Sequence, residues 1–162
     1  WFDMDEAPTD GGDPFYAFYV SFEGAENEFP MVVRKEGDAY KVDWRLFAEC
    51  KDRLFASFRD SGESGPGSFY LVMQRHSYWG KDRTQFRELD NLNCYKIEPP
   101  YPGFETFVFL PKDAPQVALI EEVSGWGLPP VDVVLELERR KFAHGESHLV
   151  IKSIKKTSWV AP

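Results

Sequence analysis

Residues 113–138 read DAPQVALIEEVSGWGLPPVDVVLELE, and the order of elements within them restricts the architectures open to the second half of the chain. Asp113-Ala114-Pro115 has the composition of a helix start, because Asp caps helix N-termini and Pro is tolerated in the first turn. The helix is expected to end near Gly125. Apolar and polar residues then alternate over residues 131–138, which predicts a strand with one buried face.

Further strand-like stretches flank this helix and strand. Residues 69–79, 93–98 and 104–110 precede the helix, and residues 148–159 follow the strand. The predicted order is therefore β-β-β-α-β-β, and a helix between the third and fourth strands is the arrangement of the OB-fold, a small five-stranded barrel. A cystatin-like or split βαβ arrangement is the structural alternative.

The first part of the chain has a different pattern. Residues 15–22, 29–34 and 39–44 read as three strands, and residues 45–59 as an amphipathic helix with an interruption. A Gly- and Ser-rich linker follows, so we predict two units, 1–66 and 67–162, in a mostly β, α+β protein. Three short strands with one apolar face need a covering layer, so the two units are expected to pack together.

The chain has 162 residues, with 19 Lys and Arg against 27 Asp and Glu, a net charge of −8. This balance argues against a general binder of nucleic acid or membrane surfaces, because both need an excess of cations. Residues 1–66 hold seven basic and fifteen acidic side chains, whereas residues 67–162 hold twelve of each. At 43% hydrophobic and 16% aromatic residues, the chain is expected to fold without a disulfide or metal.

The sequence contains no pattern typical of catalysis or metal binding. It has no GxSxG, HExxH, Walker or GxGxxG motif, and His144 and His148 flank a Gly in a predicted strand connection. Asp43 has no acid–base partner nearby, so we expect it to face water or cap a helix while Trp44 packs in the core. Cys50 and Cys94 favour two buried free thiols over one bridge. We therefore predict no catalytic residue, no metal and no cofactor.

One set of residues suggests a ligand-binding surface on the barrel. The last two strands carry six cations, and aromatic side chains of the same unit offer stacking surfaces for a single strand. The competing interpretation is a solvated strand edge whose lysines block strand-to-strand aggregation. This interpretation is favoured, because the negative charge of the first unit would repel a nucleic acid. The cations are Arg139, Arg140, Lys141, Lys152, Lys155 and Lys156, and the candidate ligand-binding residues are Tyr70, Trp79, Tyr95, Arg139, Arg140 and Lys152.

Three segments carry a resemblance to a known group of proteins. Residues 40–47 (YKVDWRLF), 92–96 (LNCYK) and 149–160 (LVIKSIKKTSWV) resemble, in order and spacing, a family of uncharacterised bacterial proteins from planctomycete- and verrucomicrobium-type genomes. The most specific feature is Val-Asp-Trp-x-x-Phe, and the likeness extends loosely over residues 15–160. The Val-Asp-Trp strand also looks like the final strand of NTF2-like domains, although residues 1–66 are too short for a complete one.

The resemblance transfers no activity and no functional residue, because that family has none established. Many of its members look membrane-tethered through an upstream segment, and this chain begins Trp1-Phe2 without an initiator Met. We therefore expect a non-catalytic protein-interaction or structural module, the soluble part of a longer, membrane-tethered bacterial protein. A protein partner is expected and a small-molecule cofactor is not. The alternative is single-stranded nucleic-acid or oligosaccharide binding through the barrel.

Overall fold

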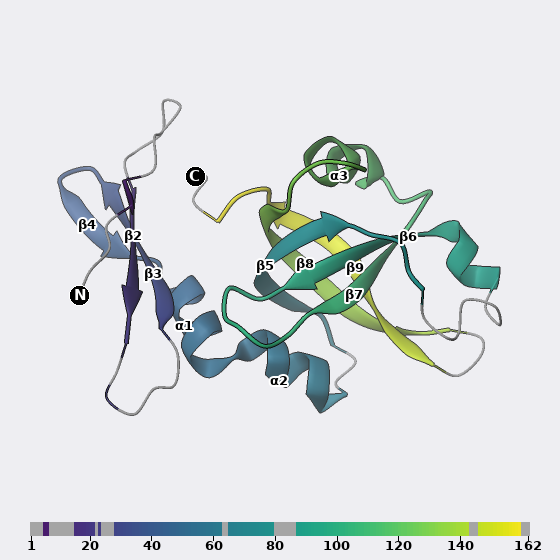
Figure 1. Cartoon of the computed structure of the whole chain (residues 1–162), viewed down its shortest axis with the longest axis horizontal. Coiled ribbons are helices and arrows are strands. Elements are labelled where there is room, and N and C mark those ends of the chain that lie inside the picture. Colours follow the sequence, from purple (N-terminus) through teal and green to yellow (C-terminus); the bar gives the residue numbers. More distant parts are fainter. Residues whose placement is uncertain are drawn as a thin grey trace.

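The computed structural model describes residues 5–6, 15–21, 23, 28–62, 65–79, 87–142 and 146–159. His144, considered above as a metal ligand, lies outside the described residues. Figure 1 shows a small antiparallel sheet at one end of the molecule, a β-barrel at the other, and two short helices between them. The predicted mostly β, α+β class is confirmed.

The sheet contains four strands in the order β1 (Asp5–Glu6), β2 (Phe15–Val20), β3 (Phe29–Glu36) and β4 (Ala39–Val42). All neighbours are antiparallel, and the β3–β4 turn uses Gly37 at a φ of 61°, a backbone conformation that favours glycine. The three predicted strands are present, and β1 is an additional short one. One sheet face, which includes Val32 and Phe15, packs against the following helix.

The opposite face of this sheet is apolar as well. Cross-strand pairing places Tyr16, Val33 and Val42 in one row, and Phe18 and Met31 in the next. None of these five belongs to the buried clusters formed by the described residues. Tyr40 shares this face and is exposed, whereas the other five side chains are half-buried.

The predicted interrupted helix consists of α1 (Trp44–Asp52) and α2 (Leu54–Ser61). Arg53 separates them in a left-handed conformation, with a φ of 50°. Asp43 caps α1, because its Oδ1 accepts a hydrogen bond from the Leu46 amide at 3.2 Å. The prediction that Trp44 packs in the core is wrong: 69% of it is exposed. The strand alternation ends at the cap, so the helical period places Trp44 on the outer surface of the first turn.

The barrel comprises β5 (Gly67–Arg75), β6 (Leu92–Glu98), β7 (Thr106–Pro111), β8 (Val131–Lys141) and β9 (Ser147–Lys156). They close in the order β5-β6-β7-β9-β8, and β7 and β9 pair in parallel. The helix α3 (Val117–Ser124) lies between the third and fourth barrel strands, as predicted, and η2 (Arg87–Asn91) is a 3₁₀ turn before β6. α3 begins later than predicted, because residues 112–116 form the turn that leads into it.

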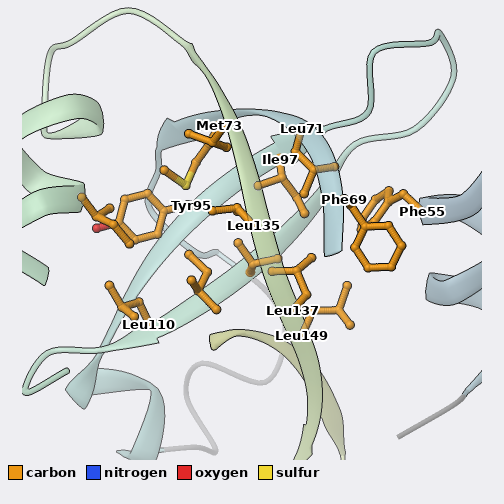
Figure 2. Packing of buried hydrophobic residues seen from close by; sticks show 14 of the residues in the cluster. Phe55, Phe69, Leu71, Met73, Tyr95, Ile97, Leu110, Leu135, Leu137 and Leu149 are labelled. Carbon is orange, nitrogen blue, oxygen red and sulfur yellow. The ribbon is translucent and has the colours of Figure 1, made fainter. Parts of the chain in front are cut away.

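Figure 2 shows the barrel interior, which is filled by alternate residues of every strand. The aromatic rings of Phe55 and Phe69 close one end, with their centroids 5.5 Å apart. Phe55 and Phe58 come from α2, so this helix contributes to the barrel core although it precedes the predicted boundary at residue 66. The labelled interior residues are Leu71, Met73, Tyr95, Ile97, Leu110, Leu135, Leu137 and Leu149.

A second buried cluster joins the sheet to the barrel. Leu46 and Cys50 of α1 pack there with Val32 of the sheet and Tyr101 of the barrel unit. Trp159 packs against this cluster, and its indole Nε1 donates to the carbonyl oxygens of Leu71 and Val133 at 3.1 and 3.2 Å. Arg34 of the sheet donates to the Trp159 carbonyl. The prediction that the two units pack together is confirmed.

Candidate functional site

The residues predicted to form a ligand-binding surface do not gather on one surface. Tyr95 is fully buried, and its hydroxyl donates to Glu121 Oε1 at 2.9 Å. The prediction that Tyr95 offers a stacking surface is wrong, because Tyr95 occupies an inward position of β6 and its ring belongs to the barrel core. Trp79 is 77% exposed, so its role in binding stays a prediction.

Tyr70 belongs to the junction between the units. Its hydroxyl donates to Asp43 Oδ1 at 3.3 Å, and its ring packs against the cluster of α1 and the sheet. Burial, followed by the neighbouring Asp43 carboxylate, raises the pKa of Tyr70 to about 12. Asp43 thus caps α1, pairs with Arg34 at 3.2 Å and accepts the hydrogen bond from the Tyr70 hydroxyl. Its side chain is largely buried, so Asp43 has the expected capping role but does not face water.

Several basic residues of β8 and β9 bond to local partners. Arg139 Nη2 donates to the Arg59 carbonyl at the end of α2 at 2.6 Å, and Arg140 pairs with Glu138 at 3.0 Å. Lys152 pairs with Glu136 at 3.1 Å. Three of the six predicted cations, Arg140, Lys152 and Lys155, therefore form ion pairs. The two lysine pairs arise because the strand pairing places Glu136 of β8 beside β9.

Glu136 is the centre of this network. Its carboxylate lies 2.8 Å from the ammonium of Lys155 and accepts from the Ser153 hydroxyl at 2.8 Å. Hydrogen bonds from Lys155, Ser153 and Lys152 lower the pKa of Glu136 to about 2. Glu136 is therefore a carboxylate at neutral pH.

A groove of about 580 Å³ lies between the α1–α2 elbow and the barrel. Trp44 and Leu54 line it and are unusually exposed for large apolar residues, at 69% and 42%. Leu54 follows the elbow directly as the first residue of α2, whereas Trp44 follows the Asp43 cap as the first residue of α1. The remaining lining residues are Arg45, Ala48, Glu49, Ser68, Tyr70, Val134, Lys155 and Lys156.

Glu49 is the buried polar residue of this groove. Its Oε1 accepts a hydrogen bond from the Phe55 amide at 2.8 Å, so the side chain of α1 caps the N-terminus of α2. Burial raises the pKa of Glu49 to about 7, and the Phe55 hydrogen bond opposes that shift in part. The groove thus combines apolar side chains, three cations and a carboxyl group that titrates near neutral pH.

A second pocket, of about 380 Å³, lies where β5 ends. Arg75, the last residue of β5, is only 11% exposed in its side chain and lines this pocket together with Trp126. Its guanidinium carbon lies 4.9 Å from the centre of the Tyr95 ring and 5.3 Å from that of Trp126. Arg75 Nη2 donates to Asn93 Oδ1 at 2.8 Å.

The other polar groups of the described chain show no arrangement for metal or thiol chemistry. No group of three His, Cys, Asp or Glu residues in the described ranges could hold a metal ion. The predicted free thiols are confirmed, since Cys50 and Cys94 are both buried and unbridged. Burial raises both thiol pKa values to about 12, so neither is a thiolate at neutral pH.

Arg75 and Trp126 are not among the predicted site residues, and Trp44 is predicted in the core but lies on the surface. A signal for Arg75 was present, because it continues the inward series of Phe69, Leu71 and Met73 and therefore places a cation at the end of a buried alternation. Trp126 follows α3 in a Gly-Trp-Gly turn, which gives no signal of the distant Arg75.

Comparison with family models, with curated proteins and with solved structures gave no match. Within the described parts of the chain, no helix has both the length and the apolar character needed to cross a bilayer.

Proposed function

We propose that the chain is a non-catalytic protein-interaction module that binds an extended, acidic segment of a partner protein in the α1–α2 groove. The observation that carries the proposal is the pair of exposed apolar residues, Trp44 and Leu54, beside a groove of about 580 Å³. Tryptophan is one of the residue types enriched at energetically important positions of interfaces, and apolar surface beside a concavity is typical of binding sites.

The charge of the groove indicates the chemistry of the partner. Arg45, Lys155 and Lys156 line it, although the whole chain carries a net charge of −8. Lys155 also pairs with Glu136, so the groove is moderately rather than strongly positive. A segment with one large apolar residue flanked by Asp or Glu would match both the apolar side chains and the cations.

Fluorescence polarisation with short labelled peptides tests this proposal. One peptide carries Leu flanked by Glu residues, and its matched control carries Lys in place of Glu. We expect the acidic peptide to bind and Trp44→Ala to weaken it by about tenfold or more, the usual loss at an aromatic anchor. The matched protein control is Tyr40→Ala, which removes an exposed aromatic from the sheet face.

Two results would contradict the proposal. Equal affinity for the acidic and basic peptides would remove the charge argument, and a loss of binding with Tyr40→Ala but not with Trp44→Ala would move the site to the sheet. Absence of binding by peptides with Leu, Phe or Trp at the central position would reject the groove as a peptide site.

A second candidate is oligosaccharide or single-stranded nucleic-acid binding on the barrel. The exposure of Trp79 and Trp126, at 77% and 63%, favours it, because stacking needs accessible rings. The pairing of Arg140 and Lys152 with glutamates favours an uncharged sugar over a nucleic acid. Filter binding of oligonucleotides at two salt concentrations separates the two, since only nucleic-acid binding weakens steeply with salt.

A further inference from the structure

The pocket at the end of β5 contains an arginine whose hydrogen-bonding capacity is only partly used. A guanidinium has five N–H donors, and burying them without acceptors is costly. In the described part of the chain, Arg75 Nε and Nη1 are buried and have no hydrogen-bond partner. Nη1 lies 3.6 Å from Glu121 Oε1, too far for a hydrogen bond, and Nη2 bonds to Asn93. The guanidinium also interacts with the Tyr95 hydroxyl, and this contact lowers the pKa of Tyr95 against the larger effect of burial.

The position of this arginine is fixed by its surroundings. The rings of Tyr95 and Trp126 contact the guanidinium, and Asn93 holds Nη2. Glu121 Oε1 is shared with the Tyr95 hydroxyl at 2.9 Å and the Asn93 amide at 3.4 Å. This carboxylate therefore compensates the charge of Arg75 without satisfying its donors.

The rest of the pocket is amphipathic. Leu89, Leu92 and Phe109 supply an apolar wall, and Lys112 supplies a second cation whose Nζ donates to the Asp90 carbonyl at 2.6 Å. Asp90 also lines the pocket, and its negative charge opposes an anion there. A volume of about 380 Å³ falls within the range of small-molecule sites, which are mostly apolar with a few polar groups.

We propose that this pocket binds a small carboxylate with an apolar skeleton, whose oxygens accept hydrogen bonds from Arg75 while its carbon atoms pack against Leu89, Leu92 and Phe109. Arginine suits a carboxylate because both groups are planar and the hydrogen bonds are charge-assisted. The pocket is separate from the α1–α2 groove and shares none of its lining residues, so the two proposals stand or fall independently.

The test is an NMR titration that follows the indole resonance of Trp126, which lies against Arg75. The probes are phenylacetate, its neutral analogue phenylacetamide, and inorganic phosphate. Phenylacetate is expected to shift the resonance saturably with a dissociation constant of about 1 mM or tighter, with the amide at least about tenfold weaker. Phosphate is expected to bind more weakly than phenylacetate, because it lacks the apolar skeleton.

Three variants complete the test. Arg75→Lys keeps the charge but loses the planar donors, so phenylacetate binding should fall about tenfold or more. Lys112→Met, at an exposed position, should weaken binding a few-fold, and Lys141→Met, outside the pocket, should leave it unchanged. Lys112→Met and the amide comparison decide the outcome if Arg75→Lys does not fold. Equal binding of acid and amide, tighter binding of phosphate, or no saturable shift with any probe would overturn the proposal.

Discussion

Glu49→Gln is the substitution with the sharpest expected effect on stability. Glu49 is buried in the α1–α2 elbow, and burial raises its pKa from 4.5 to about 7. Gln has nearly the same shape, and its side-chain carbonyl can still accept the hydrogen bond from the Phe55 amide. The substitution therefore removes the titration and keeps the packing.

The sign follows from proton binding. The folded chain holds the Glu49 proton more tightly than the unfolded chain, so this group stabilises the fold fully below pH 4.5 and loses that contribution as pH rises through about 7. A difference of about 2.5 pKa units corresponds to about 3 kcal/mol of unfolding free energy at 1.36 kcal/mol per unit. Gln does not titrate, so it avoids that loss at high pH.

Urea unfolding of both proteins at about pH 5 and about pH 8 measures this effect. We expect the stability of Glu49→Gln relative to the parent to be at least about 2 kcal/mol more favourable at the higher pH. The matched control is Glu122→Gln on exposed α3 surface, which should show no such difference. Parallel pH profiles for the parent and Glu49→Gln would refute the assignment of a buried, proton-binding carboxyl group.

Three further predictions concern packing and burial. Trp44→Ala should change the unfolding free energy by less than about 0.5 kcal/mol because Trp44 is exposed, whereas Leu135→Ala in the barrel core should cost about 2–5 kcal/mol. A large loss of stability in Trp44→Ala would place Trp44 in a core. Tyr95→Phe removes the hydroxyl that donates to Glu121 and should cost about 1–2 kcal/mol in urea melts, so an unchanged midpoint would argue against that bond. Both thiols should react with a disulfide reagent only on unfolding, and rapid reaction of either in the native protein would contradict its burial.

Local signals were sufficient to predict the barrel. Short segments of sequence contain these signals: the alternation over residues 131–138, the helix before it, and the Gly and Pro residues at the ends of the strands. The interruption of the helix over 45–59 was also predicted from its apolar spacing. The exposure of Trp44 was not predicted. Trp44 lies where the spacing of apolar residues changes from the two-residue period of a strand to the 3.6-residue period of a helix, and its orientation depends on the cap at Asp43.

The candidate sites depend on contacts between distant segments, which the sequence alone does not define. The pairing of Lys152 and Lys155 with Glu136 follows from the β8–β9 register, and two irregularities shift that register near the same residue. Arg75 meets Trp126 only when the barrel has closed. The groove likewise needs the elbow at Arg53, whose left-handed backbone no sequence signal indicated.

Backbone amide chemical-shift mapping with the acidic Leu peptide tests the central claim that the α1–α2 groove is the interaction site. We expect saturable shifts concentrated in α1, the first turn of α2 and the end of β9, where Trp44, Leu54 and Lys155 line the groove. Shifts centred on β2, β3 and β4, or on the pocket around Arg75, would contradict it.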